Sequence, residues 1–221
     1  MSQIAGAPWT LQGEGYMFFY KFTKEWVVKN GFLPEALEGK FDGFFGNIML
    51  VNYQSSPVGP YRELLFMPGK FKIDNQKWYS ITKIYVNSPS STMNGKANWG
   101  IPKETCDFRR NLVKKNFFGG DTERIELLDP QGEPFFDVTL SSGGLRFPIS
   151  TALVPMELIQ YLQNKTFFTT PKGKGMGQWA TVKSLRINSK YFPDVSSVRP
   201  LAVLKVTNFS MEFPLAKIEA L

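Results

Sequence analysis

Short apolar and aromatic segments, separated by glycine and proline, make up most of the chain. Residues 78–87 alternate, with Tyr79, Ile81 and Tyr85 on one face and Trp78 on the other, which is the period of a β-strand. Similar patterns predict further strands at residues 16–23, 46–53, 63–67, 124–128, 133–141, 181–189 and 202–213. The chain is therefore expected to be β-rich.

Turn and helix signals complete the local picture. Residues 129–132, Asp-Pro-Gln-Gly, carry proline and glycine at the second and fourth positions, which predicts a hairpin between the strands that flank them. Residues 88–90, Ser-Pro-Ser, are interpreted as a break after a strand. Short helices are expected at residues 23–30 and 33–37, with a weaker helical pattern at residues 101–110.

Many strands and few helices favour a β-rich α+β fold. Its antiparallel sheet should be closed or sandwiched, because open strand edges invite aggregation. No linker or repeat divides the sequence, so residues 1–221 are expected to form a single domain.

The composition removes whole classes of chemistry. The chain of 221 residues has no histidine, which excludes imidazole bases and histidine metal ligands. Cys106 is its single cysteine, which excludes an internal disulfide and multi-cysteine metal sites. We expect no metal and no other cofactor, and we expect Cys106 to be a small buried apolar residue.

Charge and hydropathy limit the partners. The net charge of +7 favours anionic ligands, but the basic residues are scattered, which indicates a solvated surface rather than a nucleic-acid site. Residues 1–30 lack the pattern of a secretion signal, and no stretch approaches the roughly 20 apolar residues of a membrane helix. We expect a cytoplasmic protein with a small-molecule partner. The glycine-rich residues 172–177 are expected to form a mobile surface loop that could act as a lid.

Lysine is the remaining side chain that can form a Schiff base with a carbonyl substrate. Lys103 follows the bulky, turn-prone run Asn98-Trp99-Gly100-Ile101-Pro102, which could shield it from water. Burial lowers the pKa of an amine, and a neutral amine is the form that attacks a carbonyl. The alternative is a lysine whose stem lies over Trp99 while its amine stays in water.

Two segments resemble the acetoacetate decarboxylase superfamily. Residues 95–103, GKANWGIPK, resemble the family segment that leads through proline to the Schiff-base lysine. Residues 57–65, PVGPYRELL, look like the strand that precedes it, especially in the fungal branch of the superfamily. The resemblance implies a cone-shaped antiparallel β-barrel with an enclosed apolar cavity, a homo-oligomer, and Lys103 as nucleophile. It also places Glu63 in the cavity, where a carboxylate could move protons; the alternative is a strand-end glutamate paired with Arg62 or Lys70.

The sequence also departs from the family pattern. Where the family has a second lysine, Glu104 follows Lys103, and an anion facing the amine would keep it charged. The family's second cavity glutamate falls at Asn47, and the arginine expected to bind the substrate carboxylate falls near Glu14. Without that arginine, simple decarboxylation of acetoacetate is not expected.

These features predict a carbon–carbon or carbon–oxygen lyase of secondary metabolism that acts through a Lys103 Schiff base. Its substrate would be a keto acid or a polyketide-like intermediate, cleaved by decarboxylation, retro-aldol or aldol chemistry, or dehydration. Two alternatives stay open: a non-covalent cyclase or isomerase that uses carboxylates and tyrosine, and a ligand-binding barrel without catalysis. The candidate catalytic residues are Lys103, Glu63 and Glu104, and the candidate substrate-binding residues are Asn47, Tyr61, Trp99 and Glu14.

Overall fold

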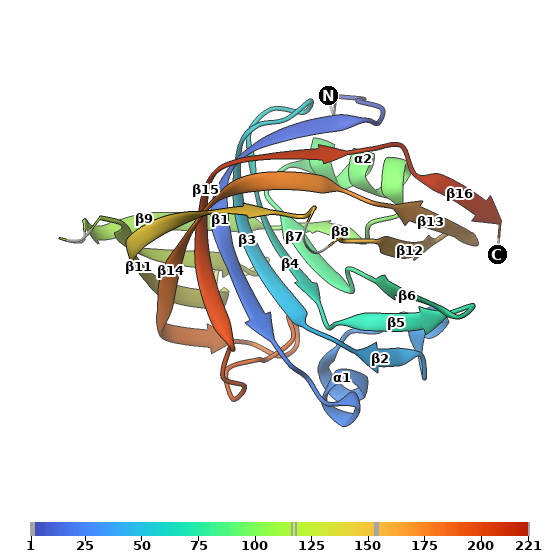
Figure 1. The fold of residues 1–221 in the computed structure, drawn as a ribbon, viewed down its shortest axis with the longest axis horizontal. Coiled ribbons are helices and arrows are strands. Elements are labelled where there is room, and N and C mark those ends of the chain that lie inside the picture. The colour runs from blue at the N-terminus through green and yellow to red at the C-terminus, as the bar shows by residue number, and fades with distance from the viewer. Residues whose placement is uncertain (1–2, 116, 118, 153–154, 221) are drawn as a thin grey trace.

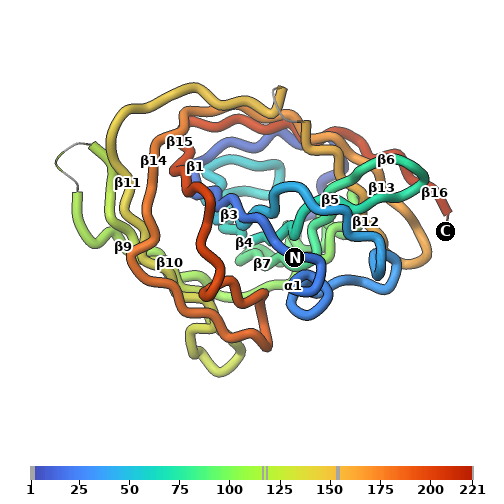
Figure 2. Tube along the Cα trace, turned by 60° about the horizontal axis from the view of Figure 1, so that its bottom comes forward, coloured from blue at the N-terminus to red at the C-terminus, as the bar shows by residue number. Residues whose placement is uncertain are grey.

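The computed structural model describes residues 3–115, 117, 119–152 and 155–220, and these form two β-sheets. The larger sheet has ten strands and curls into a half-barrel (Figures 1 and 2). In sheet order they are β8 (Lys103–Thr105), β7 (Lys83–Val86), β4 (Tyr61–Met67), β3 (Gly46–Ser55), β1 (Trp9–Tyr20), β15 (Ala202–Phe213), β14 (Lys172–Ile187), β11 (Pro134–Ser150), β10 (Asp121–Leu128) and β9 (Asp107–Lys115). All neighbouring pairs are antiparallel except β7 and β8.

A smaller sheet of six strands lies at one end of the half-barrel, to the right in Figure 1. Its order is β16 (Lys217–Ala220), β13 (Lys165–Thr169), β12 (Leu158–Leu162), β6 (Gln76–Tyr79), β5 (Lys70–Ile73) and β2 (Phe41–Gly43). The expected β-rich fold with a curled antiparallel sheet and few short helices is confirmed.

The alternation of side chains along the strands gives the larger sheet two apolar faces. Phe18, Leu50 and Leu64 belong to one buried cluster, which also contains Phe136 and Phe192. The residues between them on the same strands point the other way, since successive side chains of a strand alternate between faces. A second buried cluster forms on that other face, and the cavity described below is lined by its members.

In the described part of the chain three short helical segments join the strands. Helix α1 (Lys24–Asn30) begins after Thr23, whose Oγ1 accepts a hydrogen bond from the Trp26 N–H. A 3-10 turn covers Glu35–Leu37. Helix α2 (Pro89–Trp99) has proline at its start and ends at Gly100, whose φ of 63° favours glycine. No helix in the described part of the chain has the length and apolar character needed to cross a membrane.

Several local expectations are confirmed. The hairpin around residues 129–132 is present as β10 and β11. The strands predicted at residues 46–53, 63–67 and 202–213 correspond to β3, β4 and β15, and the helix predicted at residues 23–30 corresponds to α1.

Other expectations were wrong. Residues 78–87 form two strands, β6 and β7, which belong to different sheets. Residues 101–110 are extended rather than helical, because β8 pairs with β7 and β9 pairs with β10. The glycine-rich residues 172–177 are not a loop, since they lie in β14 between β11 and β15.

Helix α2 was not predicted. It has no apolar stripe, and residues 88–90 were interpreted only as a break after a strand. Its stability comes instead from its caps and from packing. The Ser88 Oγ accepts a hydrogen bond from the Ser91 N–H at 3.2 Å, and Trp99 is buried in the second apolar cluster.

Candidate active site

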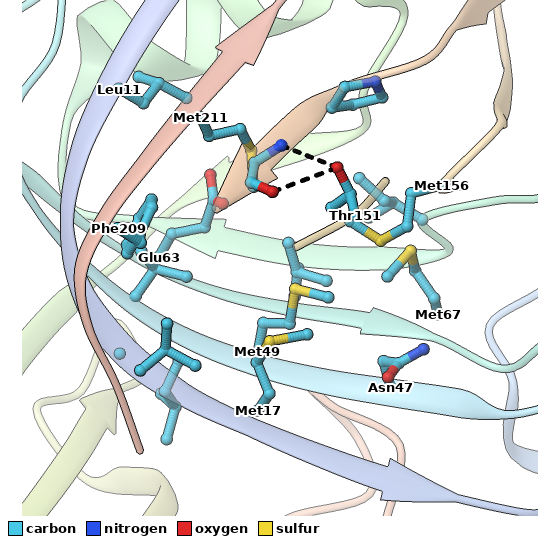
Figure 3. Close-up of a pocket in the computed structure, with 18 of the residues that line it drawn as sticks. Leu11, Met17, Asn47, Met49, Glu63, Met67, Thr151, Met156, Phe209 and Met211 are labelled. Atoms are coloured by element: carbon cyan, nitrogen blue, oxygen red, sulfur yellow. Dashed lines mark hydrogen bonds between the residues drawn. The ribbon is translucent and has the colours of Figure 1, made fainter. Parts of the chain in front are cut away.

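A cavity of about 520 Å³ lies on the inner face of the curled sheet. Strand pairing places one row of cavity-lining side chains across six strands: Leu204, Met17, Met49, Leu65, Ile84 and Lys103. Directly paired residues share a face of the sheet, so this row puts Lys103 at the end of an apolar surface. Methionines at five positions line the cavity, several of which are seen in Figure 3: Met17, Met49, Met67, Met156 and Met211.

The Lys103 amine is buried and fully engaged. Only 4% of the residue is exposed, and its Nζ donates hydrogen bonds to Glu63 Oε2 at 2.8 Å and to Ser91 Oγ at 3.0 Å. The amine also lies 5.1 Å from the centre of the Tyr61 ring, within the range of a cation–π interaction. The other oxygen of Glu63, Oε1, accepts a hydrogen bond from the Tyr53 hydroxyl at 3.1 Å.

These neighbours set the charge state of the amine. Burial lowers the pKa of Lys103, but the negative charge of Glu63 opposes it, and the net shift of the pKa is upward. Burial also raises the pKa of Tyr61 to about 12 and that of Tyr53 well above its usual value. At neutral pH Lys103 is therefore an ammonium beside Glu63, and both phenols keep their protons.

Helix α2 shapes the space around the lysine. Ser91 on its first turn is fully buried and accepts a hydrogen bond from the amine. Gly95, one turn later, leaves room for the lysine stem, since a Cβ there would lie 2.7 Å from Lys103 Cδ and 2.9 Å from Cε. Ser91, Gly95 and Tyr53 were not predicted as site residues. Ser88 followed by Pro89 is a helix-start signal that could have located α2, and hence Ser91 and Gly95.

Comparisons with known proteins agree with this architecture. No family model and no curated protein matches the chain. Among solved structures, acetoacetate decarboxylase from Legionella pneumophila matches with a TM-score of 0.69 at 11% identity, covering 97% of this chain and 88% of that one. The chain has the acetoacetate decarboxylase-like fold.

Two further solved structures share this fold. The enduracididine biosynthesis enzyme MppR matches with a TM-score of 0.64 at 13% identity, covering 98% of this chain and 89% of that one. An acetoacetate decarboxylase-like enzyme from Sphingomonas wittichii RW1 matches with a TM-score of 0.64 at 9% identity, covering 98% and 94%. Because a fold hosts many chemistries, the chemistry of this chain has to be argued from its own side chains.

Within the acetoacetate decarboxylase-like fold, five of the predicted site residues line the same cavity: Lys103, Glu63, Tyr61, Trp99 and Asn47. Glu63 pairs with Lys103, not with the Arg62 or Lys70 considered above. Burial of Lys103 also removes the alternative in which its amine lies in water.

Two predicted residues lie outside the cavity. The Glu104 side chain is about half exposed and its Oε1 lies 2.6 Å from Lys83 Nζ, because successive residues of β8 point to opposite faces. Glu14 on β1 accepts a hydrogen bond from Arg110 Nη2 at 2.7 Å, on the side of the sheet away from the cavity. Neither carboxylate therefore reaches the Lys103 amine. In the described lining of the cavity no arginine replaces the missing carboxylate-binding one.

Cys106 lies outside this chemistry. Burial raises the pKa of its thiol to about 12, so the thiolate is scarce at neutral pH.

Proposed function

We propose that the protein is a lyase that binds a carbonyl-containing small molecule as a Schiff base on Lys103. The single observation that carries this proposal is the buried Lys103 amine in an apolar cavity, 2.8 Å from a carboxylate that can exchange its proton. A buried amine paired with a proton acceptor has both requirements for imine chemistry, a nucleophile and a place to store its proton.

Lys103 and Glu63 together provide the proton transfers that imine formation needs. The Lys103 ammonium gives a proton to Glu63, and the neutral amine adds to the substrate carbonyl to form a carbinolamine. Glu63 returns the proton to the hydroxyl of the carbinolamine, which leaves as water, and a protonated imine remains. That imine accepts the electron pair of a breaking carbon–carbon bond and becomes an enamine, which takes up a proton at carbon before hydrolysis of the product imine frees Lys103. For carbon–oxygen cleavage, Glu63 removes the α-proton, the imine accepts the electron pair of that carbon–hydrogen bond, and the enamine then expels the β-oxygen, which Glu63 protonates.

The structural neighbours support a carbonyl substrate. MppR, which shares the fold, has been solved in complex with pyruvate and with the condensation product of pyruvate and imidazole 4-carboxaldehyde. Acetoacetate decarboxylase and the Sphingomonas wittichii enzyme share the fold as well. Carbonyl chemistry is thus represented among solved proteins of this architecture.

A second candidate function rests on the ion pair. The net upward shift in the pKa of Lys103 means that the amine is mostly charged at neutral pH. A permanently charged Lys103 could donate a hydrogen bond to a substrate carbonyl while Glu63 acts as a base, without a covalent step. That arrangement would serve a cyclase or isomerase.

Borohydride trapping separates the two candidates. The protein is incubated with a ketone and sodium cyanoborohydride, digested and analysed by mass spectrometry. A Schiff-base enzyme adds the reduced ketone at Lys103, whereas a non-covalent enzyme leaves Lys103 unmodified while ligand still binds. Lys103→Met should abolish the label, and Lys83→Met, which removes an amine outside the cavity, should retain it.

A further inference from the structure

Asn47 is an isolated polar side chain in an apolar part of the cavity wall. It is 4% exposed and lies on β3, where it pairs with Met67 on one side and with Phe19 on the other. Its Nδ2 makes one long contact of 3.4 Å with the Phe45 carbonyl. Its Oδ1 has no hydrogen-bond partner within the described part of the chain. An unpartnered buried amide oxygen is destabilising, so a role in packing does not account for asparagine here.

The position of Asn47 sets the length of a ligand that reaches from it to Lys103. Glu63, which holds the Lys103 amine, pairs with Val51, and Asn47 is four residues farther along the same strand. At roughly 3.3 Å per residue this separates the two polar ends of the cavity by ~13 Å. Because an extended chain advances roughly 3.5 Å for every three bonds, a ligand spanning that distance has about eleven bonds.

The surface between the two ends is apolar and adaptable. Figure 3 shows Glu63 and Asn47 at opposite ends of a group of side chains that includes Met17 and Met49. Methionine is flexible and polarisable, so such a wall fits alkyl or polyene chains of varied shape.

The charges of the cavity disfavour an anionic ligand. In the described lining the cations are Lys103, already neutralised by Glu63, and Lys174, which is exposed to solvent. A carboxylate on the ligand would lose its hydration without gaining a free buried cation.

We propose that the substrate is an uncharged, elongated ketone or aldehyde, with its carbonyl at Lys103 and a hydroxyl group at its far end on Asn47. A hydroxyl both donates and accepts hydrogen bonds, so it can pair with Asn47 whether the Oδ1 or the Nδ2 of the amide faces the ligand. The inference rests on the proposed function for the carbonyl end, and Asn47 is a specificity-determining residue rather than a catalytic one.

Four probes test the inference: a linear methyl ketone of about eleven carbons, its counterparts with a terminal hydroxyl or a terminal carboxylate, and pyruvate. Affinities are measured by quenching of tryptophan fluorescence, since Trp9 and Trp99 line the cavity. We expect the hydroxyl ketone to bind at least about tenfold more tightly than the plain ketone, and both to bind more tightly than either carboxylate.

Asn47→Leu keeps the branched shape of the side chain and removes its amide. In this variant the preference for the hydroxyl ketone should vanish while the plain ketone binds at least as well as before. Asn52→Leu, the same substitution on β3 at a residue that does not line the cavity, is the control that keeps the preference. An unchanged preference in Asn47→Leu, or tighter binding of pyruvate or of the carboxylate ketone to the original protein, overturns the inference. If trapping fails with every probe while the preference holds, the Schiff-base proposal falls, and the assignment of the hydroxyl end to Asn47 stands.

Discussion

Gly95→Ala is the most direct test of how the fold holds the lysine. The added Cβ would lie 2.7 Å from Lys103 Cδ, and ordinary contact begins at 3.4 Å, so the stem must move by about 0.7 Å. The stem is fixed at both ends, because its backbone pairs with β7 and its amine is bonded to Glu63 and Ser91. The displacement must therefore reach the amine.

The size of the effect follows from this geometry. Misplacement of a reacting group by about 1 Å costs up to a hundredfold in rate, so we expect borohydride trapping at Lys103 to slow by roughly tenfold to a hundredfold. Stability should change less, because alanine improves helix propensity by about 1 kcal/mol and overpacking costs roughly 1–3 kcal/mol. Lys96→Ala, at an exposed position of the same helix, is the matched control. Trapping at the original rate in a fully folded Gly95→Ala protein would refute the reasoning.

Further substitutions probe the charges around the site. Because the Lys103 proton passes to Glu63 and not to solvent, the trapping rate should stay flat from neutral pH up to the pKa of the amine, and a tenfold rise per pH unit would contradict this. Glu63→Gln removes the internal proton acceptor and leaves burial, which lowers the pKa of Lys103, so trapping in this variant should rise with pH up to that lowered pKa in the same assay. Tyr53→Phe leaves one oxygen of Glu63 without its donor and should destabilise the fold by about 1.5–3 kcal/mol in urea denaturation; a smaller loss would mean that water replaces the hydroxyl. Glu104→Gln and Glu14→Gln should leave trapping unchanged, with a loss of about 1 kcal/mol or less for the exposed Glu104, and slower trapping in either would show that its carboxylate acts on the amine.

The sequence pattern predicts strands where apolar periodicity and turn chemistry agree. The hairpin of β10 and β11 is an example, since residues 129–132 close it locally. The helix prediction for residues 101–110 was wrong because pairing with β7 and β10 sets their conformation. A local sequence pattern contains no information about those distant partners. Helix α2 was missed because it has no apolar stripe, and its caps and tertiary contacts stabilise it instead.

The candidate site likewise has features that the sequence predicts and features that depend on the tertiary structure. Lys103 and Glu63 were recognised from short motifs, but their pairing depends on the order β8, β7, β4 in the sheet. Glu14 and Glu104 were candidates by position in the chain, and strand alternation sends both away from the amine. Ser91 reaches the amine from α2, so predicting that contact required the helix that the pattern did not reveal.

The environment of Lys103 determines how it could become a nucleophile. Residue 104, where the acetoacetate decarboxylase pattern would have a second lysine, is Glu104, and its side chain points away from the cavity, so no cation on this part of β8 favours the neutral amine. Burial favours the neutral form, but Glu63 and Tyr61 together outweigh it, and the net shift in the pKa of Lys103 is upward. Activation must therefore come with the ligand: a substrate that fills the apolar cavity excludes water, and its carbonyl accepts the amine as the proton passes to Glu63. On this argument an apolar substrate is part of the activation, because a small hydrated one would leave the resting ion pair intact.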